Sequence, residues 1–178
     1  ADKRLALGKE LSERKLAGAV LTLPDSIAWL LNVRGSDVER NPFPLSFALL
    51  KADGGVLWFV APEKLTAELK AHLDAAVECR APEAFGPALD ACRGQRILVD
   101  PQSAPVWIFE RLTAAGATPV EGDDPCQLPK AAKNPVEQAG ARAAHRRDGA
   151  AVTRFLAWYG KATAEGAVTE LDCSDRLE

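Results

Sequence analysis

Two histidines supply the chain's only imidazole groups, and their placement bears on whether a metal centre can form. His72 and His145 lie far apart, each alone in a segment with helical apolar spacing, and no H-E-x-x-H sequence occurs. A protein metal site typically needs about three or four converging His, Cys, Asp or Glu side chains. We therefore interpret both histidines as structural or surface residues. We expect no catalytic residue, no cofactor-binding residue and no metal ligand in this chain.

The adjacent carboxylates Asp123 and Asp124 are the next candidates for cation binding. They stand in a segment rich in Gly and Pro, where neighbouring aspartates more often accept hydrogen bonds within a turn. Ligation and turn formation are both chemically open to this pair, and the turn is the favoured interpretation.

The densest polar cluster spans residues 32–42, between an apolar helical segment and a predicted strand. An ion pair of Arg34 with Asp37 or Glu39 would organise such a loop. Contact with a substrate or with another domain is the alternative use of these charges.

Other motifs that carry chemistry are missing from the sequence. There is no G-x-G-x-x-G, no G-x-x-x-x-G-K-[ST] and no G-x-S-x-G. No C-x-x-C pair occurs either, so we expect reduced, structural thiols at the four cysteines, Cys79, Cys92, Cys126 and Cys173. A basic patch surrounds His145 and is typical of a solvated helix face; it consists of Arg142, Arg146 and Arg147.

Alternating helical and strand-like segments, with one hairpin among them, would position these residues. This order favours a mixed sheet covered by helices. The predicted helices span 3–15, 27–31, 62–76, 82–92 and 104–115, and the predicted strands span 19–23, 46–50, 56–60, 96–99 and 118–121. Residues 51–55 form the turn of the hairpin, because Asp and Gly accept positive φ there.

A domain boundary is expected between residues 122 and 133, where turn formers replace periodicity. Asn134, Pro135 and Glu137 then form a strong helix start with a capping box. The helix is predicted to run to Tyr159 and to end at Gly160. Its apolar face would consist of Val152, Phe155, Leu156 and Tyr159.

Composition bounds the class of protein. The 178 residues are 47% hydrophobic and 26% charged, enough to bury a core, and the net charge of -3 is spread along the chain. This pattern argues against nucleic acid and membrane partners.

No apolar run reaches the ~18–20 residues of a bilayer span, and no signal peptide is recognisable, so a cytoplasmic protein is expected. The absence of Met, with Ala1 first, leads us to expect a processed or excised piece of a longer protein that continues past Glu178.

Several stretches, in order along nearly the whole chain, resemble Xaa-Pro aminopeptidases of peptidase family M24B. They are residues 25–38 (DSIAWLLNVRGSDV) with Asn41-Pro42, then 130–137 (KAAKNPVE), 142–150, 155–158 and 168–171. The resemblance implies an α/β fold class: a creatinase N-terminal-like mixed β-sheet flanked by helices, plus the initial helices of a pita-bread catalytic domain. It places a non-catalytic middle domain at residues 1–130 and the truncated start of the catalytic domain at residues 131–178.

The same resemblance implies the chemistry of the parent protein. Such enzymes remove the first residue from peptides with Pro second, using two divalent metal ions, manganese or zinc, held by Asp, His and Glu side chains. Those ligands would lie beyond Glu178, so this chain alone is expected to be inactive and to hold no cofactor. The expected partners are peptide substrates with an Xaa-Pro N-terminus and a second copy of the parent in a homodimer.

Two alternatives stay open. The chain could be a stand-alone, non-catalytic interaction module that kept the creatinase-like fold. It could also come from a prolidase or creatinase relative, which is similar in fold and differs in substrate.

Overall fold

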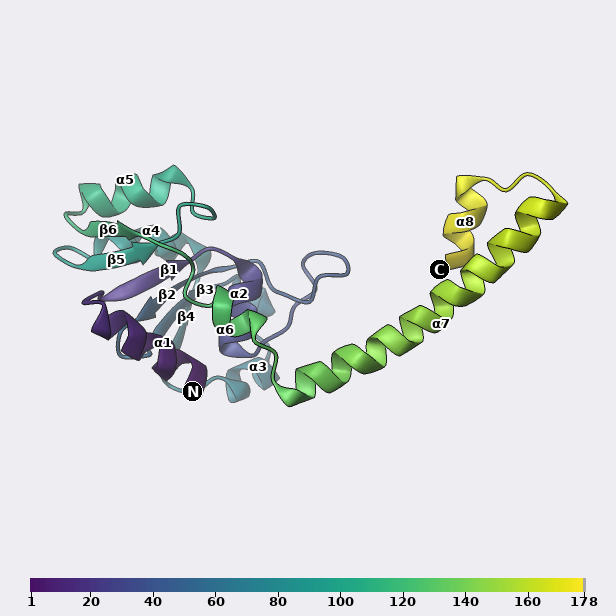
Figure 1. The fold of residues 1–178 in the computed structure, drawn as a ribbon. Coiled ribbons are helices and arrows are strands. Elements are labelled where there is room, and N and C mark those ends of the chain that lie inside the picture. Colours follow the sequence, from purple (N-terminus) through teal and green to yellow (C-terminus); the bar gives the residue numbers. More distant parts are fainter. Residues whose placement is uncertain (178) are drawn as a thin grey trace. The chain divides into compact units, whose positions relative to one another are not determined.

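The computed structural model describes residues 1–177 of the 178-residue chain, which forms two compact units (Figure 1). The first unit is Ala1–Ala131 and the second begins at Ala132. All the strands belong to the first unit, whereas the second consists of helices.

A six-stranded mixed sheet with strand order β4-β3-β2-β1-β5-β6 forms the centre of the first unit. The pairs β1–β2 and β2–β3 are antiparallel, and β1–β5, β3–β4 and β5–β6 are parallel. The strands are β1 (Gly18–Leu21), β2 (Phe47–Lys51), β3 (Val56–Phe59), β4 (Val77–Arg80), β5 (Arg96–Val99) and β6 (Thr118–Glu121). The expected α/β class with a mixed, helix-flanked sheet is confirmed.

Helices cover both faces of the sheet, as Figure 1 shows. Ala19 and Leu21 of β1 point into one core with α1, α2 and Cys126, while Val20 points into the opposite core with α4 and α5. The period-2 alternation of side chains thus serves two apolar layers at once. The helices of this unit are α1 (Asp2–Glu13), α2 (Pro24–Leu31), α3 (Ala67–His72), α4 (Phe85–Asp90), α5 (Val106–Ala114) and α6 (Gln127–Ala131), with 3₁₀ turns at Pro62–Lys64 and Pro82–Ala84.

The predicted hairpin is confirmed, and one strand was missed. Gly54 adopts φ +83° in the turn between β2 and β3, which a residue with a Cβ tolerates poorly. The helix predicted over 62–76 is much shorter, because the Thr66 side chain caps α3 and Leu73 is already extended. The strand β4 follows at once, pairing in parallel with β3. Its alternation of Val77 and Cys79 with charged residues is too short to stand out in the sequence.

Residues 122–133 are packed more firmly than the sequence suggested. Asp124 and Cys126 are buried, and α6 follows them. The Lys130 ammonium forms an ion pair with Asp25 at the start of α2 and also reaches the Ser26 hydroxyl. Side chains far away in the sequence thus hold most of this segment against the first unit, and the division between the two compact units falls after Ala131.

The second unit begins with the predicted cap. The Asn134 side chain accepts a hydrogen bond from the Glu137 amide at 2.9 Å, and the Glu137 carboxylate accepts one from the Asn134 amide at 2.8 Å. The helix α7 (Pro135–Glu165) continues through Gly160, so the predicted end is wrong. A glycine inside a helix costs only about 1 kcal/mol, and the residues after it are good helix formers. A second helix, α8 (Glu170–Leu177), follows.

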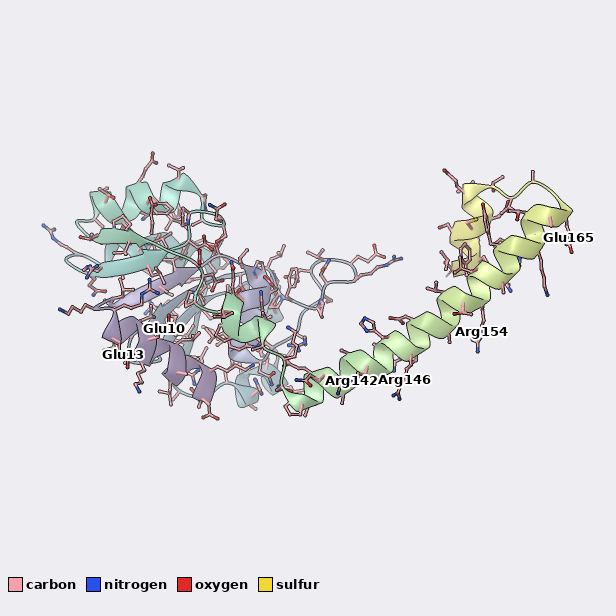
Figure 2. The ribbon with its side chains drawn as sticks, in the orientation of Figure 1. Glu10, Glu13, Arg142, Arg146, Arg154 and Glu165 are labelled. Atoms are coloured by element: carbon pink, nitrogen blue, oxygen red, sulfur yellow. The ribbon has the colours of Figure 1, made fainter. Side chains whose placement is uncertain are left out.

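No residue of α7 is buried within its own unit. Figure 2 shows Arg142, Arg146 and Arg154 spaced along this helix. The predicted apolar face is present as an exposed stripe, with Val152 49%, Leu156 60% and Tyr159 43% exposed. Among the residues that the structure describes, no helix is both long and apolar enough to cross a membrane.

The close approach of β1 to β2 predicts a strong effect of Gly18→Ala. A Cβ at position 18 would lie 2.6 Å from the Leu50 carbonyl oxygen, so the strand pair must separate. We expect the free energy of unfolding of the first unit to fall by about 1–3 kcal/mol, measured by urea denaturation with tryptophan fluorescence. Gly140→Ala is the control, because a Cβ there meets nothing within 4 Å. An unchanged midpoint for Gly18→Ala would contradict this interpretation of the sheet.

Candidate functional site

The long loop between α2 and β2 is the most elaborate polar surface of the first unit. The loop starts at Asn32, the residue that ends α2. Asn32 adopts a left-handed conformation with φ 54° and ψ 47°. Gly35 then passes so near the returning chain that a Cβ would meet the Pro44 nitrogen at 2.5 Å. The loop is therefore folded back against itself.

One carboxylate anchors this loop. The Asp37 carboxylate accepts hydrogen bonds from the Lys64 ammonium and from the Leu45 amide, each at 2.5 Å. Lys64 also donates to the Leu45 carbonyl at 3.2 Å. The Lys64 hydrogen bond, followed by that of the Leu45 amide, holds the pKa of Asp37 below its usual value. The two ends of the loop are thus tied together through Lys64.

The prediction that Arg34 pairs with Asp37 or Glu39 is wrong. The Arg34 guanidinium donates to the Val33 carbonyl at 2.9 Å, and the Asp37 carboxylate forms its ion pair with Lys64. Glu39 lies 3.6 Å from Arg40. Lys64 comes from the 3₁₀ turn after β3, so only the tertiary fold brings it to the loop, and no local pattern in the sequence points to it.

A cavity of about 330 Å³ lies under the loop. Its buried wall includes Trp58, whose side chain is fully buried and whose indole nitrogen has no hydrogen-bond partner among residues 1–177. The other lining residues come from the loop, the 3₁₀ turn and α3: Arg34, Gly35, Ser36, Asp37, Pro44, Glu63, Lys64 and Leu69. Of these residues, Arg34 and Asp37 were candidates from the sequence, whereas Trp58, Glu63 and Lys64 were not.

These groups suit binding better than covalent chemistry. Among residues 1–177, no carboxylate pairs with the Arg34 guanidinium, which keeps donors available for a carbonyl or carboxylate. Ser36 lines the cavity, but a hydroxyl nucleophile needs a hydrogen-bonded base, and within residues 1–177 the Ser36 hydroxyl has no hydrogen bond to Asp37, Glu63 or Lys64. The arrangement can orient a polar chain against an apolar wall.

The two histidines lie in different units. The His72 imidazole is 3.1 Å from the Leu31 carbonyl oxygen, and His145 on α7 is 2.9 Å from the Ala141 carbonyl oxygen. Each ring is therefore engaged by backbone. Throughout the part of the chain that the structure describes, no group of three or more His, Cys, Asp or Glu side chains comes close enough to share a metal ion.

The carboxylate pair divides into an exposed Asp123 and a buried Asp124. The Asp124 carboxylate accepts the Cys126 amide at 2.7 Å, which is a turn hydrogen bond, and the Asp124 amide donates to buried Asp100 at 3.2 Å. Sequence reasoning missed Asp100; an aspartate directly after a parallel strand was the available signal. Together these groups fix the turn that leads into α6.

The remaining candidates show no arrangement for chemistry. All four cysteines are free, and burial raises the pKa of the thiols of Cys79, Cys92 and Cys126, which keeps them protonated. The basic residues of α7, namely Arg142, Arg146 and Arg147, are exposed along the helix.

Similarity to known proteins is strong and covers the whole chain. A family model described as the creatinase/prolidase N-terminal domain matches residues 1–137. A probable Xaa-Pro aminopeptidase P of Aspergillus flavus is 35% identical over 189 residues, covering 99% of this chain and 28% of that protein. The corresponding protein of Aspergillus niger is 36% identical over 182 residues, covering 97% of this chain and 30% of its own length. The chain thus spans less than a third of these relatives.

Solved structures agree in fold. The X-prolyl aminopeptidase of Caenorhabditis elegans, described as a cytosolic enzyme with a di-nuclear active site, has a TM-score of 0.86 at 27% identity, over 99% of this chain and 30% of that one. The Xaa-Pro dipeptidase of Bacillus anthracis has a TM-score of 0.73 at 13% identity, over 99% of this chain and 47% of that one. The second likeness concerns the fold alone.

The anchoring role of Asp37 predicts a pH-dependent effect of Asp37→Asn. A carboxyl whose folded pKa lies below the unfolded value of ~3.9 stabilises the fold at neutral pH and loses that contribution as pH falls through the folded pKa. We expect Asp37→Asn to cost about 1 kcal/mol at pH 7 and to equal wild type well below pH ~4, in urea unfolding measured across pH.

The matched control is Glu39→Gln, because the Glu39 side chain is 87% exposed in the same loop. This variant should behave like wild type at every pH. A cost for Asp37→Asn that persists unchanged into acid would show that shape, and not charge, anchors the loop.

Proposed function

Because the chain belongs to the creatinase/prolidase N-terminal domain family, we propose that it is a structural and substrate-access segment of a metal-dependent Xaa-Pro aminopeptidase. The parent would remove the first residue from peptides with Pro second. The observation that carries this proposal is the 35% identity with a probable Xaa-Pro aminopeptidase P over 99% of the chain. That identity extends beyond residue 137, where the family model ends, into α7 and α8.

A prolidase or creatinase parent is less well supported. The dipeptidase and prolidase structures with a TM-score of at least 0.5 are 12–14% identical to this chain, and the likeness reflects the shared fold. We also propose that residues 1–130 are the non-catalytic middle domain and that residues 131–178 start the pita-bread catalytic domain.

In this proposal, the metal ions of the parent are bound by residues outside this chain. The C. elegans enzyme is described as di-nuclear, and two ions, manganese or zinc, would activate a water molecule and polarise the scissile carbonyl. The donors in residues 1–177 do not fit such a centre, because the imidazoles lie in separate units and no group of three donors converges. No step of the reaction is therefore assigned to this chain.

The loop over residues 32–46 is the part of the segment that we propose meets the peptide. Its support is geometric: Asp37 and Lys64 fix the loop, while Arg34 keeps guanidinium donors for a peptide carbonyl or carboxylate. The partners proposed for the parent are Xaa-Pro peptides and a second copy in a homodimer, in the cytoplasm. Neither nucleic acid nor a membrane is proposed as a partner.

The full-length gene product tests this function directly. With manganese it should release the first residue of an Xaa-Pro-Xaa peptide and leave both an Xaa-Pro dipeptide and creatine intact. The 178-residue chain should show no turnover and retain no stoichiometric metal after gel filtration. Sedimentation of the full-length protein should give the mass of a dimer. Turnover of the dipeptide or creatine, or a parent without any peptidase activity, would contradict the proposal.

Replacing Arg34 tests the role of the loop. In the full-length peptidase, Arg34→Ala should raise KM for an Xaa-Pro-Xaa peptide roughly tenfold while changing kcat little, because a charged hydrogen bond to bound substrate is lost. Arg93→Ala is the control, since Arg93 is an exposed arginine in the turn before β5, at the sheet edge away from the loop. Equal KM values in the Arg34→Ala and Arg93→Ala variants would show that the loop does not contribute to substrate binding.

A further inference from the structure

A second and larger cavity lies on the opposite face of the sheet, at the edge where β1 and β5 begin. It measures about 620 Å³. Small residues create the space: Ala88 and Ala91 stand on the wall where α4 ends, and Ala17 and Gly18 lie where β1 starts. Small residues on both sides keep helix and sheet from filling this region.

The floor of this cavity is apolar. Leu49, Leu57 and Ile97 point into the core on the α4 side, and they are 5%, 7% and 1% exposed. Such a floor gives up contact with water when an apolar group covers it, which is favourable in proportion to the area buried.

Of the charged side chains on the rim of this cavity, the Lys51 ammonium is the one without a hydrogen-bond or ion-pair partner among residues 1–177. The Arg80 guanidinium is paired with Glu78 at 2.7 Å, and the Asp53 carboxylate accepts the Gly55 amide at 2.8 Å. The side-chain ammonium of Lys51, at the end of β2, has no hydrogen bond or ion pair with any residue from 1 to 177. Its charge also contributes to the electrostatics of Glu78 and of the Cys92 thiol, which places the ammonium by the cavity.

We propose that this cavity binds a small amphipathic carboxylate, with its apolar body on the leucine and isoleucine floor and its carboxylate paired with Lys51. Ligand sites commonly occupy about 300–1,000 Å³, with mostly apolar walls and a few polar groups that fix orientation. An unpaired ammonium beside a desolvated apolar floor favours an anion over a neutral molecule. This inference does not depend on the proposed peptidase function.

The test uses the 178-residue chain and two probes of matching shape, 4-phenylbutyrate and 4-phenylbutan-1-ol. Amide chemical shifts in ¹H–¹⁵N spectra are followed during titration. The acid should produce saturable shifts at Gly18, Cys92 and Gln95, and the alcohol should bind more weakly at the same residues.

Three variants separate charge from shape. Lys51→Gln should weaken binding of the acid about tenfold and leave binding of the alcohol unchanged. Lys70→Gln removes the same charge from α3, which packs on the other face, and should change neither. Ala91→Phe adds bulk at an exposed wall position and should abolish binding of both probes. Spectra of the free variants report whether each remains folded.

Two results would overturn the proposal. One is the absence of saturable shifts at the cavity residues with either probe. A cavity that is filled by a polypeptide segment in place of a small molecule would give this result. The other is an affinity for the acid that is the same in wild type and in Lys51→Gln.

Discussion

The burial of β1 between an antiparallel and a parallel neighbour is the constraint on which the first unit depends. All four residues of β1 are buried, and the side chains of Ala19, Val20 and Leu21 each belong to one of two apolar cores. Gly18 lets β2 approach, so the hairpin and β5 can both pair with the same short strand. Because the central strand is covered on both faces, the sheet edges and the loops beyond them are left to carry polar groups.

The polar groups at those edges serve mainly to hold segments in place. Asp37 ties the long loop through Lys64, and Asp100 and Asp124 fix the turn before α6. Lys130 then joins α6 to the start of α2. Such pairs contribute little energy each, yet they set the positions of the chain segments they join.

The candidate site could be predicted only in part. The loop was recognisable because its charges interrupt an apolar pattern, and Arg34 and Asp37 do line the cavity. The partner of Asp37 was not recognisable, since Lys64 is distant in the sequence and reaches it only through the path of β3. Trp58 was not recognisable as a site residue either, because only the fold places its buried indole nitrogen under the loop.

Local patterns in the sequence were enough to predict the α/β class, the hairpin and the capping box of α7, because alternation, turn residues and capping act over a few neighbouring residues. The pairing of β4 with the sheet and the packing of α6 against α2 depend on tertiary contacts. Short segments with weak local preference take the state that burial and long-range pairing favour, and those contacts come from residues far away in the chain.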